Sequence, residues 1–328
     1  MQALLYLKYL TPLKIYNYIR LYFSYLLKRI NKLSYPAFIS FEPTNFCNLK
    51  CFECPVGNGK SLRNKGFANI ELFKKIISDN KKYLINILLY FQGEPFIHPQ
   101  IEKLIEIARE NKIFTEISTN AVLIPEIFNK IKNSLPDKLI ISIDGITDET
   151  YLKYRKNSDL NKVTETLDLL SALPRKIRPY IEVQFLIFKH NQNDISKLKE
   201  FLSYYKIDKI SLKTAQISDF ENINILPDNP KFSRYKLVDN KLMLKYPIKN
   251  KCKRIIFGSV ISFDGKLLPC CFDKNSQNVL GNVNKSTISE IRNSIKYQNF
   301  VNQVFTDRKK ISICNNCTEG QKNIKISL

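Results

Sequence analysis

Three cysteines within eight residues constrain this chain more than any other feature of its sequence. Cys47, Cys51 and Cys54 follow a short apolar run at residues 37–41, with the spacing C-x3-C-x2-C. Three thiolates on one loop do not close a four-coordinate site, whereas structural zinc normally takes four protein ligands. An iron-sulfur cluster held by three thiolates leaves one iron open to a ligand that is not protein. The spacing therefore favours a cluster with an open iron over a zinc site or three buried cysteines.

The length and the cysteine pattern limit the class of protein. The 328 residues have room for one large domain and a smaller one, and a hydrophobic content of 44% suffices for a packed core. The eight cysteines fall into two groups, the chain has no evident signal peptide, and it is far longer than a disulfide-stabilised mini-domain. Thiols that bind iron need a reducing compartment, so we expect a cytoplasmic protein.

The charge is strongly positive, at +22 from 52 Lys and Arg against 30 Asp and Glu. Nucleic acid, an anionic membrane surface or an acidic substrate would each complement it. The sequence contains no RNA-recognition signature, zinc finger or repeated aromatic and basic pattern, which argues against nucleic acid. The charge alone does not select a partner.

Residues 1–35 are predicted to form a separate, basic amphipathic helical segment. It interleaves Leu, Ile, Tyr and Phe with basic residues and contains no acidic residue. A span across a bilayer needs about 20 mainly apolar residues, and Lys14 and Arg20 interrupt this segment. Three interpretations stay open: the helix lies at an anionic membrane surface, packs on the rest of the chain, or docks on a partner.

From residue 36 to 215, short apolar runs alternate with amphipathic segments, which predicts parallel strands covered by helices. Six such units predict an α/β fold, either a partial (β/α)6 barrel or an open curved sheet, with ligands at the carboxyl ends of the strands. Residues 216–250 lose this alternation and are predicted to be a linker. The expected strands are residues 37–41, 87–91, 114–118, 139–143, 181–188 and 209–213, and the expected helices are residues 70–80, 99–111, 125–133, 148–154, 160–172 and 194–205.

The cysteine loop, placed directly after a predicted strand, resembles the signature of the radical S-adenosylmethionine (radical SAM) superfamily. The resemblance implies a 4Fe-4S cluster on Cys47, Cys51 and Cys54, whose open iron is chelated by the methionine part of S-adenosylmethionine. In much of the superfamily an aromatic residue precedes the third cysteine. Here Glu53 holds that position and the aromatic residue is Phe52.

Further candidate cofactor contacts follow the predicted strands. Gln92, Gly93 and Glu94 resemble the family's Gly-Gly-Glu turn, which receives the methionine ammonium group, although the tripeptide by itself indicates only a turn. Glycine permits a tight turn and a carboxylate complements an amine. The other candidates are small polar groups at strand ends, with a cation for the methionine carboxylate: Ser118, Asn120, Ser142, Asp144 and Arg155. For Ser142 and Asp144, a contact with the substrate is an equally good interpretation. The pair Asp144-Gly145 is also typical of the turn that begins a helix.

The second cysteine group lies within residues 251–328. It contains Cys252, Cys270, Cys271, Cys314 and Cys317, with a hairpin turning at Asp264-Gly265 and a helix over residues 287–300 between them. The arrangement resembles the small α+β SPASM/twitch domain of radical SAM enzymes. The spacing of the short version of that domain implies an auxiliary 4Fe-4S cluster on Cys252, Cys270, Cys314 and Cys317, with a weak preference for Cys270 over Cys271. Four thiolates in two pairs would also suit tetrahedral zinc.

The resemblance implies that the chain cleaves S-adenosylmethionine reductively and that the 5′-deoxyadenosyl radical removes hydrogen from a substrate. An auxiliary cluster accepting the remaining electron implies oxidation, or alternatively epimerisation, of a small sugar-like metabolite. Two alternatives stay open: a maturase of a ribosomally made peptide, and a non-catalytic electron-transfer or scaffold protein. A low-potential donor such as flavodoxin or ferredoxin is the expected electron source.

Overall fold

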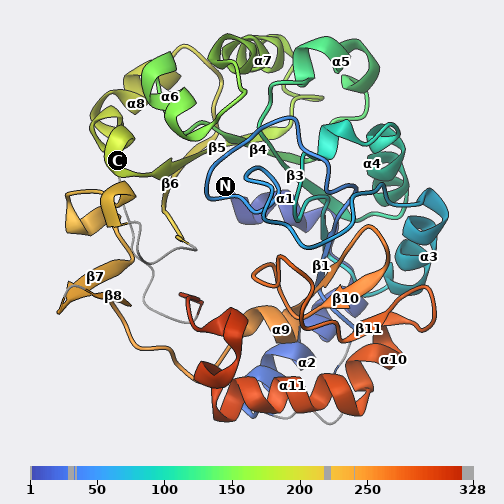
Figure 1. Cartoon of the computed structure of the whole chain (residues 1–328). Coiled ribbons are helices and arrows are strands. Elements are labelled where there is room, and N and C mark those ends of the chain that lie inside the picture. Colours follow the sequence, from blue (N-terminus) through green and yellow to red (C-terminus); the bar gives the residue numbers. More distant parts are fainter. Residues whose placement is uncertain (1, 29–32, 34, 218–222, 240, 320–328) are drawn as a thin grey trace. The chain divides into compact units, whose positions relative to one another are not determined.

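The computed structural model describes residues 2–28, 33, 35–217, 223–239 and 241–319 (Figure 1). The chain forms two compact units, each assembled from separated stretches of sequence. Unit 1 comprises Met1–Phe46, Ser61–Ile117 and Ile248–Gly320, and unit 2 comprises Cys47–Lys60, Ser118–Pro247 and Gln321–Leu328. In the described part of the chain, no helix is long and apolar enough to cross a membrane.

Unit 1 contains a largely parallel sheet with the strand order β11-β10-β9-β1-β2-β3. Strands β9, β1, β2 and β3 are parallel, whereas β10 runs antiparallel to both β9 and β11. The bounds are β1 Phe38–Phe41, β2 Asn86–Leu88, β3 Phe114–Thr119, β9 Gly258–Ile261, β10 Lys266–Leu268 and β11 Gly281–Asn282. The predicted strand at residues 87–91 is thus shorter and begins one residue earlier.

Alternation along β1 gives the sheet of unit 1 two different faces. Ile39 and Phe41 are fully buried, and the Phe41 ring lies 4.9 Å from that of Phe73 on α3 (Ile70–Asn80). Phe38 and Ser40 are half-buried on the opposite face. Period-two burial of this kind is what a strand imposes on its side chains. The remaining helical segments that follow β2 in this unit are η1 Pro95–Ile97 and α4 Ile101–Glu110.

The hairpin predicted around Asp264-Gly265 is confirmed, with Gly265 at φ +83° in its turn. The sequence did not predict that the hairpin's first strand, β9, pairs in parallel with β1. The predicted single helix over residues 287–300 is wrong, because the chain breaks at Ser294 (ψ 153°), whose side chain caps the next helix at Tyr297. The helical segments here are α9 Lys253–Phe257, α10 Ile288–Asn293, α11 Ile295–Thr306, η5 Arg308–Lys310 and η6 Ser312–Cys314.

The amino-terminal helices α1 (Gln2–Leu7) and α2 (Pro12–Leu26) belong to unit 1 and pack on it. Asn17 donates a hydrogen bond to the Tyr35 carbonyl at 2.9 Å, and Leu21 is fully buried. Tyr18 lies 5.0 Å from the ring of Phe257 on α9. Of the three interpretations of this segment, intramolecular packing is therefore confirmed for the inward face of α2.

Unit 2 contains the parallel strands β4, β5 and β6, in that order, and Figure 1 shows its helices outside them. All five residues of β4 are buried, as expected for a strand covered on both faces. The segment predicted as a linker contains an antiparallel hairpin, β7–β8. The bounds are α5 Ile124–Ile131, β4 Lys138–Ser142, α6 Asp148–Tyr154, α7 Leu160–Ala172, β5 Tyr180–Ile187, η2 Lys189–Asp194, α8 Ile195–Leu202, β6 Lys209–Thr214, η3 Ile223–Ile225, η4 Pro230–Phe232, β7 Tyr235–Val238 and β8 Lys241–Leu244.

Candidate active site and iron-sulfur ligands

The loop carrying Cys47, Cys51 and Cys54 is fixed within unit 2 by hydrogen bonds. The Lys50 backbone N–H donates to the Lys156 carbonyl at 2.9 Å. The side chain of Asn120, just after β3, donates to Asn48 Oδ1 at 2.9 Å. Cys51 is buried, while Cys47 and Cys54 are half-buried. Three thiols on an anchored loop, two of them partly accessible, suit a cluster that must meet a small-molecule ligand.

Gly57 was not singled out from the sequence, although the structure makes it part of this loop. A Cβ at this position would lie 2.6 Å from the Cys51 backbone nitrogen and 2.8 Å from its carbonyl oxygen. Such contacts are closer than atoms tolerate, so only glycine lets the chain return over Cys51. A glycine three residues beyond the third cysteine was the available signal.

Asp144 and Arg155, two of the predicted cofactor residues, contact each other in unit 2. Arg155 Nε donates to Asp144 Oδ2 at 2.6 Å, and the guanidinium is near enough to Cys51 for its charge to lower the pKa of that thiol. Burial raises the pKa of the Cys51 thiol, and the charge of Arg155 opposes that rise. Burial by itself would lower the pKa of Arg155, but Asp144 and Cys51 raise it well above its usual value. A permanent cation therefore lies beside the cysteine loop.

The aromatic residue at the shifted position, Phe52, packs within unit 2. Its ring lies 5.1 Å from Tyr154 and 5.5 Å from Phe188, and those two rings are 4.6 Å apart. Burial raises the pKa of Tyr154 well above its usual value, so its hydroxyl stays protonated. Tyr154 and Phe188 were missed from the sequence because only folding brings them to the loop.

The predicted turn at Gln92, Gly93 and Glu94 lies in unit 1. Gly93 has φ +76°, and a Cβ there would lie 2.6 Å from the Phe46 carbonyl oxygen. Both facts require glycine. The Glu94 N–H donates to the Phe46 carbonyl at 2.7 Å, and the nearly buried Glu94 carboxylate accepts from the Phe96 N–H at 3.1 Å. The turn therefore packs directly on the residue before Cys47.

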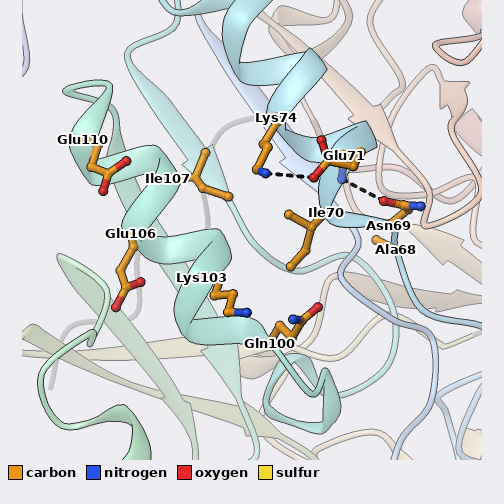
Figure 2. Close-up of a pocket in the computed structure, with 10 residues that line it drawn as sticks. All are labelled: Ala68, Asn69, Ile70, Glu71, Lys74, Gln100, Lys103, Glu106, Ile107 and Glu110. Atoms are coloured by element: carbon orange, nitrogen blue, oxygen red, sulfur yellow. Dashed lines mark hydrogen bonds and ion pairs between the residues drawn. The ribbon is translucent and has the colours of Figure 1, made fainter.

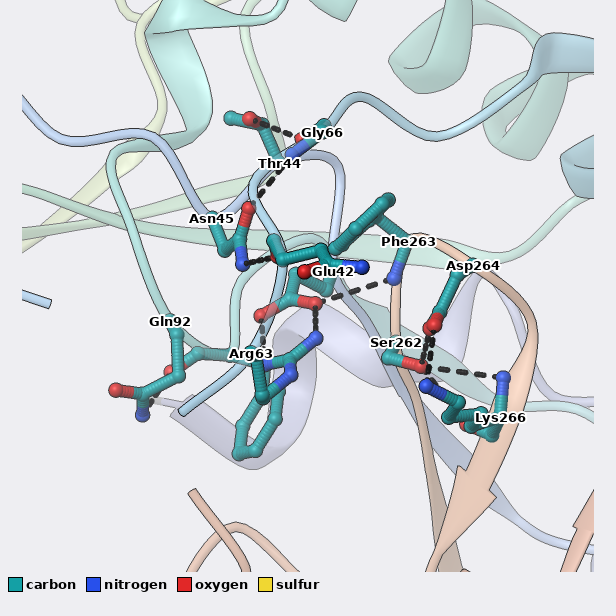
Figure 3. A network of polar contacts seen from close by, with 12 residues as sticks. Glu42, Thr44, Asn45, Arg63, Gly66, Gln92, Ser262, Phe263, Asp264 and Lys266 are labelled. Carbon is teal, nitrogen blue, oxygen red and sulfur yellow. Dashed lines mark hydrogen bonds and ion pairs between the residues drawn. The ribbon is translucent and has the colours of Figure 1, made fainter. Parts of the chain in front are cut away.

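A buried ion pair between Glu42 and Arg63, which was not predicted from the sequence, stabilises the chain just before the cysteine loop (Figure 3). Glu42, fully buried, receives two hydrogen bonds from the Arg63 guanidinium, one of them at 2.8 Å. Its Oε2 also accepts from the backbone N–H of Phe263, in the turn after β9, at 3.1 Å. The adjacent Asn45 and Thr44 bind the backbone at Asn64 and Gly66. One carboxylate thus ties the end of β1 to the carboxy-terminal hairpin.

The auxiliary cysteines lie in unit 1, and three of the four predicted ligands are buried there. Burial raises the pKa of Cys252 to about 11. Burial also raises the pKa of Cys270 well above its usual value, and the thiols of Cys271, Cys252 and Cys317 add to the rise. Buried thiols that penalise each other's ionisation need cations to become thiolates, which is what iron supplies.

Two arginines contact this thiol group. The buried Arg308 donates to Cys317 Sγ at 2.9 Å and to the backbone carbonyls of Lys251 and Glu319, each at 2.8 Å. Arg254 donates to Cys271 Sγ at 3.3 Å and pairs with Glu319 at 2.9 Å. Arg254 thus engages Cys271 as Arg308 engages Cys317, so the preference for Cys270 as the ligand stays a prediction.

Ser118 and Ser142, two further predicted residues, lie at or near strand ends. Ser118 is on β3, and Ser142 ends β4 opposite Gln184 of β5. Among the described residues, no three Cys, His, Asp or Glu side chains are already arranged to hold a metal ion, so both ligand sets remain predictions.

Two hollows in unit 1 differ in character. One, of about 420 Å³, is mainly apolar and reaches Cys270 and Cys271 from β1 and α9. The other, of about 620 Å³, lies between α3 and α4 and is lined by charged side chains (Figure 2). Its Lys74 is paired with Glu71 at 2.8 Å, and it contains none of the predicted site residues.

Comparison with known families decides the class of protein. Residues 41–202 match the radical SAM superfamily, and residues 252–318 match the SPASM iron-sulfur cluster-binding domain. The chain belongs to the radical SAM superfamily. It is a radical SAM enzyme with a carboxy-terminal SPASM domain, as the resemblance implied. The auxiliary site of such a domain holds an iron-sulfur cluster, so zinc is no longer the alternative.

Individual relatives agree with this family. The chain is 25% identical over 226 residues to the probable GTP 3′,8-cyclase of Methanocaldococcus jannaschii, which covers 67% of this chain and 73% of the relative. The solved structure of BtrN with AdoMet and 2-DOIA has a TM-score of 0.58 at 17% identity, covering 88% and 95% of the two chains. Streptococcus suis SuiB bound to precursor peptide SuiA has a TM-score of 0.59 at 18% identity, covering 89% and 72%. The structural matches confirm the predicted α/β fold of radical SAM enzymes.

The cofactors of this radical SAM enzyme are S-adenosylmethionine, the 4Fe-4S cluster that binds it and an auxiliary iron-sulfur cluster. The residues fit these groups. Thiols alone form both donor sets, Arg155 offers a cation beside the first set, and Arg308 donates to a sulfur of the second. All eight cysteines are free of disulfides.

Proposed function

We propose that this enzyme removes a hydrogen atom from a small, sugar-like metabolite and completes an oxidation or an epimerisation. The observation that carries the proposal is the hollow of about 420 Å³ in unit 1. Its size is that of small-molecule sites, and Cys270 and Cys271 are part of its lining. A substrate held there would lie beside the auxiliary cluster, which is where an electron left on an oxidised substrate must go.

When bound, the first cluster supplies one electron to the sulfonium of S-adenosylmethionine, giving methionine and the 5′-deoxyadenosyl radical that abstracts hydrogen. The chain supplies orientation. Cys47, Cys51 and Cys54 hold the cluster, Asn120 and Gly57 fix their loop, and Arg155 offers its charge to the methionine carboxylate. Gly93 and Glu94 shape the turn for the ammonium group, and Ser118, Ser142 and Asp144 line the strand ends. Cys252, Cys270, Cys314 and Cys317 hold the auxiliary cluster.

The reductant in this proposal is a low-potential flavodoxin or ferredoxin, and the compartment is the reducing cytoplasm. The excess of positive charge on the chain favours an acidic donor surface. The outward face of α2, which is apolar and basic, supports a peripheral position at the inner face of the membrane as part of this proposal.

Anaerobic incubation with dithionite and S-adenosylmethionine tests the reaction class. We expect the reconstituted enzyme to contain about eight irons per chain and to form 5′-deoxyadenosine. The triple variant Cys47→Ala, Cys51→Ala, Cys54→Ala should lack the four irons of the first cluster and form no 5′-deoxyadenosine. A reconstituted chain that forms no 5′-deoxyadenosine with any candidate substrate would instead be an electron-transfer or scaffold protein.

A peptide substrate is the second candidate. It is favoured by the similar fold of SuiB, whose structure holds a precursor peptide. Deuterium transfer distinguishes the two candidates: label from a deuterated sugar or from a deuterated peptide will appear in 5′-deoxyadenosine, and only the true substrate class will give it.

A further inference from the structure

Helix α2 buries polar residues on the side where an ordinary surface helix buries apolar ones. Its buried positions are Lys14, Asn17 and Leu21, two of which are polar. Lys14 Nζ donates to the Lys112 carbonyl at 2.6 Å, and Asn17 donates to Tyr35. An amphipathic helix normally buries its apolar stripe instead. Lys14 and Asn17 therefore anchor this helix together with Leu21, while most of its large apolar residues are exposed.

The outward residues of α1 and α2 form a large apolar surface, here called the α2 face. Each of its members is at least 41% exposed: Leu7, Leu13, Ile15, Tyr16, Tyr18, Ile19, Tyr22, Phe23, Leu26 and Leu27. Half of the twenty exposed large hydrophobic residues of the described chain thus come from this one segment. A contiguous exposed apolar surface of this kind marks a site of interaction.

The charges on the α2 face select its partner. Lys8, Arg20 and Lys28 are exposed, and the first acidic residue of the chain is Glu42. A surface with apolar side chains, tyrosines and cations only is complementary to a bilayer with anionic headgroups. The occupant of the α2 face is therefore an anionic membrane surface.

Two residues belong both to this face and to the hollow beside the auxiliary cysteines. Tyr18 and Tyr22, 41% and 43% exposed, line the cavity of about 420 Å³ that reaches Cys270 and Cys271. The lining also includes the apolar residues Phe38, Leu88, Phe257 and Val260. Lys253 and Arg254 also line it, and Glu319 is the only carboxylate among the described lining residues. The described lining is thus mainly apolar with a net positive charge, and Tyr18 and Tyr22 connect it to the α2 face.

We propose that the substrate is a membrane-borne amphiphile, a molecule with an apolar chain and an anionic headgroup, which passes under α2 into this cavity. The proposal rests on the proposed function, since it names the substrate class of the same site. The apolar chain lies against Tyr18, Tyr22 and Phe257, and the headgroup lies between Lys253 and the auxiliary cysteines. The sugar-like part named in the proposed function is then the headgroup of this amphiphile, and its apolar chain accounts for the outward apolar face and the apolar lining.

Flotation tests the membrane step with the full-length reconstituted enzyme. The probes are vesicles of phosphatidylcholine alone and of phosphatidylcholine with phosphatidylglycerol. We expect binding to the anionic vesicles, weakened at least about tenfold in the Ile19→Asp, Phe23→Asp variant, because two large apolar side chains leave the interface. The matched control, Tyr204→Asp with Ile295→Asp, introduces the same two charges at exposed large hydrophobic residues outside the α2 face and should float like the wild type. Equal flotation of all three proteins, or no flotation, overturns the proposal.

Calorimetric titration with monomeric dodecyl phosphate tests the cavity. We expect binding that dodecanol and inorganic phosphate match only weakly. Gly258→Val should weaken dodecyl phosphate binding at least about tenfold, because Gly258 lines the cavity and the valine side chain would take up part of it. Flotation should not change, since the nearest atom to an added Cβ is the Arg254 carbonyl oxygen at 3.3 Å. Flotation without dodecyl phosphate binding, or binding unaffected by Gly258→Val, overturns the substrate class. Formation of 5′-deoxyadenosine without substrate reports the proposed function separately, so the two failures are distinguishable.

Discussion

The Arg155 guanidinium holds the Asp144 carboxylate through two contacts of 2.6 Å to Oδ2, from Nε and Nη2. The other oxygen, Oδ1, accepts from the Leu186 backbone N–H at 2.6 Å. Asp144 is 1% exposed, so nearly all of its interactions are with protein. Asp144, which follows β4, thus fixes the position of the Arg155 cation near Cys51.

Removing either partner of this pair should be costly. We expect Arg155→Ala and Asp144→Ala each to lower the free energy of unfolding by about 3–5 kcal/mol, because each leaves a buried charge without its partner. The double variant should lose less than the sum of the two. Anaerobic urea unfolding of the four proteins measures the coupling. Additive losses would show that the two charges stabilise the fold independently.

The choice between adjacent thiols is directly testable. Cys270→Ser should lose the auxiliary cluster, about four irons per chain, whereas Cys271→Ser should keep it, because the spacing favours Cys270 and the thiols of Cys252 and Cys317 raise the pKa of Cys270. Iron analysis and the visible spectrum of both variants, prepared in parallel, measure this. The reverse result would make Cys271 the ligand.

The Glu42–Arg63 pair should stabilise unit 1 far more than a surface pair does. Glu42→Gln removes a buried charge that receives Arg63 and the Phe263 N–H, and we expect a loss of about 3 kcal/mol or more. The matched control is Glu149→Gln, which breaks the exposed i,i+4 pair with Lys153 and should cost less than about 0.5 kcal/mol. Similar unfolding midpoints for the two variants would contradict this assignment.

Glu182 on β5 should make stability depend on pH at the acidic end. Burial opposes ionisation of Glu182, but hydrogen bonds from Ser211 and Lys138 outweigh it and lower the pKa below the usual 4.5. A carboxyl whose pKa is lower in the folded state stabilises the fold above its unfolded pKa, and this stabilisation is lost as pH falls through the folded value.

The urea midpoint of the wild type should therefore fall as pH decreases below about 4.5, and Glu182→Gln should flatten that decline. Glu149→Gln, an exposed acid, serves as the control and should retain the decline. A Glu182→Gln profile parallel to that of the wild type would place the acid sensitivity elsewhere.

Much of the fold was predictable because its signals are local. The helices at residues 70–80, 148–154 and 160–172 were predicted with the bounds observed, since periodic burial and capping by Asn69, Thr147 and Asp159 define them. The break at Ser294 was missed, because a serine is as compatible with a helix interior as with a cap until its neighbours are placed.

The candidate site was predictable only in part. The cysteines and Gly93 carry their signal in residue type and spacing. Gly57 had such a signal in its place three residues after Cys54, but Tyr154 and Phe188 carry none, because their roles depend on contacts with residues far along the chain. Arg292 and Arg308, both almost fully buried, would be assigned to the surface from sequence alone, yet each finds its partners at backbone carbonyls.

The sequence by itself determined the ligand chemistry, the alternation of strands and helices, and the family, because thiol spacing and hydrophobic period are properties of neighbouring residues. The tertiary structure decided that β9 pairs with β1, that Arg155 pairs with Asp144 near Cys51, and that α2 buries Lys14 and Asn17. These features depend on the summed packing and desolvation of groups distant in sequence, and no local pattern encodes that sum.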